Sequence, residues 1–243
     1  MTKEKDRLFA NPKSEIDAFD FGEETAEVFD DMLERSVPLY RELQRMTGEL
    51  ANEFAVSGTQ VYDLGCSTGI TLQTLCATVE KEVSFIGVDF SRAMLDKARH
   101  NLTRLDIRRD CRFEEADLNT GVGIENASVV VLNLTLQFVR PLYRDRLIND
   151  IASGLVDNGC LILVEKVLSN DSLFNRTFVR LHHEMKRRNG YSELEIAQKR
   201  EALENVLIPY RAEENIELLK KNGFRHADVF FKWYNFCGLL GIK

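Results

Sequence analysis

The sequence predicts an α/β protein built on a mostly parallel sheet. Between residues 58 and 166, short apolar segments alternate with helical segments, the pattern of successive strand–helix units. The first apolar segment ends at a glycine turn, residues 65–69, that opens directly into a helix. A chain of 243 residues suffices for one such domain with additions. We expect an N-terminal helical segment, residues 1–57, that covers a pocket in a sheet domain, residues 58–243, with a helical insertion at about 172–206.

Two helices are expected before the sheet. Residues 1–22 are polar with little periodicity, whereas residues 26–54 have apolar positions at helical spacing that Pro38 interrupts. The predicted elements that follow are strand 61–64, helix 70–78, strand 83–89, a helix after the N-cap Ser91, an apolar-to-acid transition at 111–118, strand 128–133, helix 142–155, a turn at 157–159 and strand 160–165.

The chain changes character after the fifth strand. Residues 172–204 are heavily charged and helical in pattern, with a break near Asn189-Gly190, which predicts an inserted helical arm. A helix at 214–221 leads into two apolar runs, 225–232 and 234–243, that are typical of a closing antiparallel hairpin.

The glycine turn predicts a loop that binds a nucleotide-type ligand. Gly65 can adopt backbone angles that other residues resist, and Gly69 leaves room for the following helix to pack on the strand. A dinucleotide fingerprint needs a second bare glycine near the pyrophosphate, where this loop has Ser67. Asp63, just before the turn, would repel phosphate and attract a cation. Both features favour S-adenosylmethionine, which carries a sulfonium and an ammonium group.

Further polar side chains follow the other strands. Asp89 ends a strand about 20 residues beyond the loop, the interval expected for an acid that binds ribose hydroxyls. Asp117 and Asn133 follow the next two strands, although each alone could equally be a helix cap. The carboxyl ends of parallel strands share the edge where the ligand crevice lies, so we expect Asp63, Asp89, Asp117 and Asn133 to converge there.

Composition excludes several classes of function. The net charge of −7 gives a field that repels phosphates, so direct nucleic-acid binding is not expected. Five scattered cysteines without C-x-x-C pairs predict reduced thiols, and no metal is expected. The first residues lead into no apolar run and no stretch approaches about 20 apolar residues, so we expect a cytoplasmic protein that neither enters a membrane nor is secreted.

Three other candidates have ordinary structural interpretations. Cys66 is better explained as a small side chain in a tight turn than as a nucleophile. His182 and His183 would point about 100° apart on a helix, which does not suit chelation of one ion. The basic run Lys186-Arg187-Arg188 is typical of a solvated helix face or a dimer contact.

Several strings together resemble one family. They are Arg35-Ser36-Val37-Pro38 with Tyr40, Val61-Tyr62-Asp63-Leu64-Gly65-Cys66-Ser67, Asn133 with Thr135-Leu136-Gln137-Phe138, and Asn189-Gly190-Tyr191-Ser192-Glu193-Leu194-Glu195 with Gln198-Lys199-Arg200. The sheet pattern resembles the Rossmann-like class I methyltransferase fold, with seven strands of which the last is antiparallel. Over nearly its whole length the chain is similar to the carboxy-S-adenosyl-L-methionine synthases, and the last two strings are more specific than a generic methyltransferase would carry.

This resemblance implies a reaction other than methyl transfer. Members of that family convert S-adenosyl-L-methionine and prephenate to carboxy-S-adenosyl-L-methionine and phenylpyruvate. A tRNA carboxymethyltransferase, their functional partner, then uses the product to make wobble 5-oxyacetyluridine. The expected assembly is a homodimer. Two alternatives would share the same pocket: a conventional methyltransferase of a small molecule or tRNA, and a protein that binds S-adenosylmethionine without turnover.

The resemblance also implies the site residues. Positions that match ligand-binding positions of the family are Tyr40, Gly65, Cys66, Ser67, Asp89, Phe90, Asp117, Leu118, Asn133 and Arg200. Arg200 matches the arginine that grips the new carboxylate, a role that suits a planar guanidinium, and is the predicted catalytic residue. It lies far along the helical arm, so we expect it to reach the pocket of a dimer partner. Phe90 stands where close relatives tend to have asparagine, yet a large apolar residue suits a purine face.

Overall fold

A computed structural model describes residues 5–105 and 107–243. Its strands form one seven-stranded sheet in the order β3-β2-β1-β4-β5-β7-β6. The strands are β1 (Gln60–Leu64), β2 (Ser84–Asp89), β3 (Cys111–Glu115), β4 (Ala127–Asn133), β5 (Leu155–Lys166), β6 (His226–Trp233) and β7 (Phe236–Ile242). The first five strands pair in parallel, and β7 is antiparallel to both of its neighbours. This topology confirms the predicted fold class.

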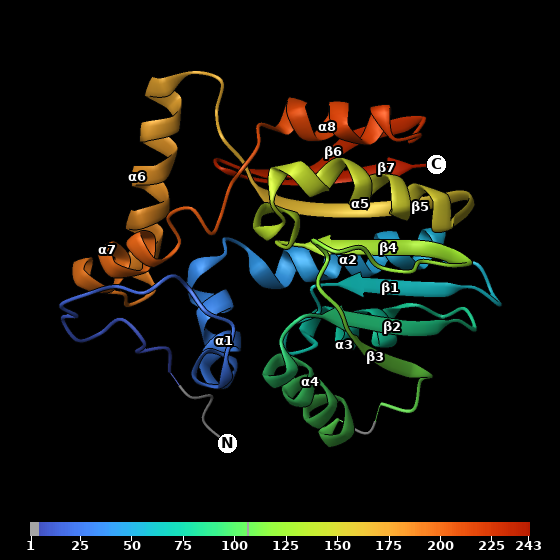
Figure 1. The fold of residues 1–243 in the computed structure, drawn as a ribbon, viewed down its shortest axis with the longest axis horizontal. Coiled ribbons are helices and arrows are strands. Elements are labelled where there is room, and N and C mark those ends of the chain that lie inside the picture. The colour runs from blue at the N-terminus through green and yellow to red at the C-terminus, as the bar shows by residue number, and fades with distance from the viewer. Residues whose placement is uncertain (1–4, 106) are drawn as a thin grey trace.

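Helices cover both faces of the sheet and one of its ends (Figure 1). They are α1 (Glu23–Ser36), α2 (Tyr40–Phe54), α3 (Ile70–Thr78), α4 (Arg92–Arg104), the 3-10 helix η1 (Leu136–Phe138), α5 (Pro141–Gly154), α6 (Ser172–Arg188), α7 (Glu193–Ala202) and α8 (Ala212–Lys221). In the part of the chain that the structure describes, no helix combines the length and apolar character needed to cross a membrane.

The apolar core lies in two layers because strand side chains alternate between faces. In β4, Val130 and Leu132 pack with α5 and α8, whereas Val129 and Val131 pack with α2, α3 and α4. All four side chains are fully buried, which explains why this strand is a continuous apolar run rather than an alternating one.

The sequence interpretation was wrong about the start of β5. Helix α5 ends at Gly154 and the strand begins at Leu155, so the predicted turn at 157–159 lies inside the strand. The turn chemistry is nevertheless present, because Asn158 has a φ of +61° and the β4–β5 register shifts between Ala127 and Val129. An irregular stretch of strand absorbs the left-handed residue that the sequence indicated.

The helical arm lies beside the end of the sheet toward which the parallel strands point, next to α1 (Figure 1). Its two helices, α6 and α7, are separated at Asn189 and Gly190, and Gly190 has a φ of +87°. The N-terminal segment is attached to α7: the Phe19 amide donates to the Ala202 carbonyl at 2.8 Å, and Gln198 Nε2 donates to the Phe9 carbonyl at 2.9 Å. The segment and the arm therefore enclose the strand ends together.

Candidate active site

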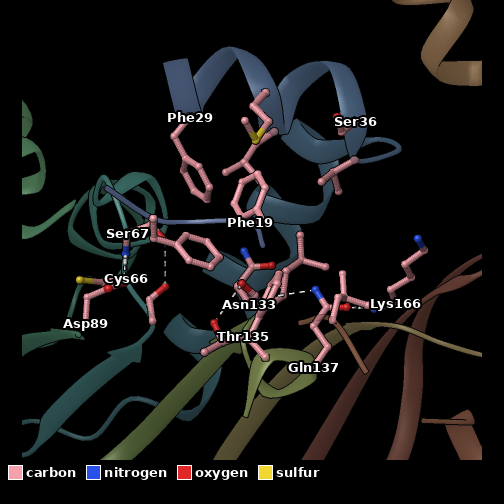
Figure 2. Close-up of a pocket in the computed structure, with 18 of the residues that line it drawn as sticks. Phe19, Phe29, Ser36, Cys66, Ser67, Asp89, Asn133, Thr135, Gln137 and Lys166 are labelled. Carbon is pink, nitrogen blue, oxygen red and sulfur yellow. Dashed lines mark hydrogen bonds between the residues drawn. The ribbon is translucent and has the colours of Figure 1, made fainter. Parts of the chain in front are cut away.

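A cavity lies at the carboxyl ends of the parallel strands, enclosed by segments that are distant in sequence. The sheet side consists of the loops after four strands, residues 65–68, 89–90, 116–119 and 133–139. The opposite side comes from Phe19 and Phe21 of the N-terminal segment, from α1 and Tyr40, and from side chains of α6 and α7. In Figure 2, Phe19 and Phe29 face Asn133 across this space.

Nearly all of the predicted ligand-binding residues line this cavity. They are Tyr40, Gly65, Cys66, Ser67, Asp89, Phe90, Asp117, Leu118 and Asn133. Arg200 does not line the cavity of its own chain; it is exposed on α7, while the adjacent Lys199 is buried and faces inward.

The glycine turn has the tight geometry that its sequence predicts. Gly65 has a φ of +76°, and a Cβ there would lie 2.4 Å from Thr135 Cγ2. Gly69 has a φ of +82°, and a Cβ there would lie 3.1 Å from Ala98 Cβ on α4. Gly65 therefore lets β1 approach the β4 loop, and Gly69 lets α3 pack beside α4.

Asp89 is held at the cavity edge by the backbone of this turn. Its Oδ2 accepts a hydrogen bond from the Ser67 amide at 2.9 Å, and its Oδ1 accepts one from the Ser91 amide at 2.9 Å. Burial raises the pKa of the carboxyl, and these amides oppose that rise by stabilising the charged form. The result is a positioned carboxylate that suits a hydroxyl-rich group such as ribose.

Asp63 lies below the loop and does not line the cavity, in contrast to the expectation that it would converge with Asp89 on the ligand. Neither of its carboxylate oxygens has a hydrogen-bond partner; the Leu72 amide faces the group without meeting hydrogen-bond geometry. Burial, followed by the nearby charge of Asp89, raises the pKa of Asp63 to about 8. The carboxyl therefore keeps its proton at pH 7 and lies beneath the site rather than in its lining.

Asn133 offers an acceptor to a cationic ligand. Its Nδ2 donates to Thr71 Oγ1 at 3.2 Å, which orients the amide, and its buried Oδ1 has no hydrogen-bond partner. Gln44 Nε2 donates to the same hydroxyl at 3.1 Å, and Gln44 Oε1 is likewise unpaired. An ammonium group of a ligand would satisfy the unpaired oxygen of Asn133, because buried acceptors without partners are costly.

An apolar slot lies beside Asp89. Phe90 is 55% exposed, and its ring meets Phe21 edge-on with centroids 5.8 Å apart. Leu118 contributes a buried apolar side chain. Asp117 lines the cavity and also accepts from the Asn119 amide at 2.9 Å, so the structure supports both interpretations of that residue. This slot has the chemistry of a purine site flanked by an aromatic ring.

Cys66 and His182 are both buried. The Cys66 thiol is buried, and that burial raises its pKa well above the ordinary value, which does not suit a nucleophile. His182 is also buried; its Nε2 donates to the Ser36 carbonyl at 2.8 Å. Within residues 5–105 and 107–243, no three His, Cys, Asp or Glu side chains gather as metal ligands.

The half of the cavity away from Asp89 is lined by lysines that sequence reasoning missed. Lys166, Lys186 and Lys199 all line it, together with His182. The basic run at 186–188 was interpreted as a solvated face or a dimer contact, yet Lys186 is only 9% exposed and lines the cavity. The helical spacing of His182 and Lys186 was the available signal, because residues four apart lie on one face of a helix.

The fold and the cavity together define a protein of the class I methyltransferase fold. The methyltransferase domain family matches residues 61–159. The structure of human N-acetylserotonin methyltransferase in complex with S-adenosylmethionine has a TM-score of 0.61 and 14% sequence identity; the match covers 90% of this chain and 56% of that one. At that identity the likeness concerns the fold alone.

Curated relatives identify the family. A carboxy-S-adenosyl-L-methionine synthase of Methylococcus capsulatus is 55% identical over 98% of this chain and 99% of the relative. Another, from Desulfotalea psychrophila, is 43% identical over 100% of this chain and 99% of its own length. The chain therefore belongs to the carboxy-S-adenosyl-L-methionine synthase family.

Proposed function

We propose that this protein converts S-adenosyl-L-methionine and prephenate to carboxy-S-adenosyl-L-methionine and phenylpyruvate. The family membership supports the product. The observation that carries the proposal is a single cavity with a carboxylate-bearing half, around Asp89, and a lysine-bearing half, around Lys166 and Lys186. One half suits a sulfonium nucleoside, and the other suits an anionic co-substrate.

S-adenosylmethionine would occupy the half formed by the glycine turn. Asp89 would accept hydrogen bonds from the ribose hydroxyls, and Asn133 Oδ1 would accept one from the ammonium group. Phe90 and Leu118 would flank the adenine. In this proposal residues 1–57 act as the cover of the pocket, because Phe19, Phe21 and Tyr40 close it from above.

The proposed reaction balances without an added oxidant or a metal. Prephenate loses its ring carboxyl as carbon dioxide and its ring hydroxyl, and becomes aromatic phenylpyruvate. The methyl group beside the sulfonium loses a proton, and the resulting ylide forms a bond to carbon dioxide. Proton and hydroxide leave as water. The protein must hold the two substrates together and exclude bulk water from the carbanion, tasks that an enclosed, aromatic-lined cavity serves.

Arg200 completes the proposal as the group that grips the new carboxylate. It is exposed in its own chain, so we assign it to the cavity of the second subunit in a homodimer. Arg200→Ala should then retain S-adenosylmethionine binding and lose carboxylated product, whereas Arg104→Ala, an exposed arginine on α4, should keep both. Unchanged product formation in Arg200→Ala would refute the assignment.

The wider role also comes from the family. The product would pass to a tRNA carboxymethyltransferase that modifies the wobble uridine, in the cytoplasm, and the acidic chain itself would not bind the tRNA. The proposal is tested by incubating the purified protein with S-adenosylmethionine, with and without prephenate, and measuring the masses of the nucleoside products by mass spectrometry. Prephenate-dependent carboxylated product supports it. Methylation of an added acceptor, or binding without turnover, would favour the two alternatives.

A further inference from the structure

Three lysines from three separate elements lie around one half of the cavity. Lys166 is the last residue of β5, Lys186 lies in the last turn of α6, and Lys199 lies in α7. Lys186 and Lys199 are only 9% and 7% exposed, and all three line the cavity. Figure 2 shows Lys166 on the side opposite Asp89, beyond Asn133 and Gln137. Buried lysines are rare unless they are paired, so two buried lysines beside a half-buried third require a physical reason.

Among the described residues, a carboxylate forms an ion pair with only one of these lysines, Lys199. Asp6 Oδ2 lies 3.8 Å from Lys199 Nζ and also accepts from the Tyr191 hydroxyl at 2.5 Å. Asp31, the other nearby acid, pairs with Arg35 at 3.1 Å. In the part of the chain that the structure describes, no ion pair or side-chain hydrogen bond joins the ammonium groups of Lys166 and Lys186 to a protein acceptor. The amino groups of Lys166 and Lys186 are therefore left for a ligand, and an anion would favour their charged forms.

The surroundings of these lysines disfavour their charged forms. Burial lowers the pKa of Lys166 and lowers that of Lys186 well below its usual value, and the neighbouring lysine charges lower the Lys186 pKa further. Burial also lowers the pKa of Lys199 to about 8, although Asp6 opposes that change. The buried His182 adds no charge, because burial and the same lysines hold its pKa far below neutrality. A bound anion would relieve both desolvation and repulsion.

Hydrogen bonds fix the position of the Lys166 backbone at the cavity. The Lys166 amide donates to Gln137 Oε1 at 3.2 Å, and Gln137 Nε2 donates to the Leu134 carbonyl at 3.0 Å, which ties the end of β5 to the loop after β4. Ser36 Oγ also lines this half; it lies near the Tyr191 hydroxyl but has no hydrogen-bond partner. A buried hydroxyl without a partner is a further donor for a carboxylate.

We propose that Lys166 and Lys186, supported by Lys199, form the binding site for the two carboxylates of prephenate. The inference rests on the proposed function and assigns the co-substrate half of the same cavity. The two uncompensated ammonium groups match a dianion, whereas S-adenosylmethionine has one carboxylate and a net positive charge. The lysines hold the co-substrate against the methyl carbon, and they continue to bind the carboxylate that phenylpyruvate retains after decarboxylation.

The test is prephenate binding by calorimetry in the presence of S-adenosylhomocysteine, which has no methyl group to react. Lys186→Met should weaken prephenate binding by at least about tenfold, and its S-adenosylmethionine affinity should stay within about twofold. Lys220→Met, at an exposed position on α8, is the matched control and should change neither affinity. Lys186→Met should also raise the thermal midpoint of the ligand-free protein, because it removes a buried charge; a lysine with a merely structural role would lower it.

Lys166→Met, at the half-buried end of β5, provides a second variant with the same expected loss. Unchanged prephenate affinity in both variants would overturn the inference, and so would a parallel loss of S-adenosylmethionine affinity. The readout is independent of turnover. If wild type binds prephenate through these lysines but makes no carboxylated product, the proposed function is contradicted and the site assignment stands. If both variants form product with an unchanged prephenate KM, the site assignment is contradicted and the proposed function stands.

Discussion

Replacement of Asp63 by asparagine should change how the stability of the fold depends on pH. Asp63 is 1% exposed beneath the glycine turn, and neither carboxylate oxygen has a hydrogen-bond partner. Its pKa rises from 3.8 to about 8, mainly through burial. The folded state thus keeps this proton where the unfolded chain releases it, so the free energy of unfolding falls as pH rises from about 4 to about 8 and levels off above that range.

The magnitude follows from the pKa shift. One pKa unit corresponds to about 1.4 kcal/mol, so the loss of stability attributable to Asp63 between pH 4 and pH 7 is about 4 kcal/mol. Asparagine has nearly the shape of aspartate, so Asp63→Asn should leave the packing unchanged. Its amide has no ionisable proton, so this position no longer titrates. The stability of Asp63→Asn relative to wild type should therefore increase by that amount across the same interval.

Urea denaturation of the ligand-free proteins at a series of pH values measures this difference. Glu165, another buried acid whose pKa rises to about 8, contributes to both proteins, and comparison of the two removes its effect. Parallel stability profiles for wild type and Asp63→Asn between pH 4 and pH 8 would refute the reasoning, since they would mean that the buried carboxyl does not retain its proton.

Two further predictions concern the glycine turn and its carboxylate. Asp89→Asn places an amide where both the Ser67 and Ser91 amides donate, so S-adenosylmethionine affinity measured by calorimetry should fall by at least about tenfold, or about 1.4 kcal/mol; undiminished affinity would contradict the ribose assignment. Gly65→Ala and Gly58→Ala both place a Cβ at positive φ, but only the Cβ at position 65 meets Thr135. Denaturation should therefore show that Gly58→Ala lowers the free energy of unfolding by about 1 kcal/mol, and that Gly65→Ala lowers it by about 2 kcal/mol more. Equal costs would show that the close approach to Thr135 is unimportant.

The elements that the sequence predicted well are those whose signals are local. Helix α3, at Ile70–Thr78, follows directly from its position between a glycine turn and an apolar strand. The N-cap Ser91 accepts from the Met94 amide at 3.2 Å, as its position ahead of a helical run predicts. The predicted start of β5 was wrong because Asn158 and Gly159 carry a turn signal. The strand accommodates these residues as an irregularity, because pairing with β4 continues past them.

Much of the sheet side of the cavity was predictable because parallel strands bring their carboxyl ends to one edge. Asp89, Asp117 and Asn133 reach the cavity for that reason. The lysine-lined half was not predictable, because Lys166, Lys186 and Lys199 come from three elements whose packing no local pattern encodes. Phe21 was missed as well, since residues 1–22 have little periodicity; its contacts with Phe29, Phe90 and Phe138 arise from tertiary folding.

The most direct measurement follows one carbon atom. Prephenate labelled with 13C at its ring carboxyl is incubated with the protein and unlabelled S-adenosylmethionine. The mass of the nucleoside product and of its fragments is then measured by tandem mass spectrometry. The proposed activity predicts a product heavier than S-adenosylmethionine by one carboxyl group, with the label in that group. A carboxylated product without label, or S-adenosylmethionine recovered unchanged while prephenate persists, would contradict it.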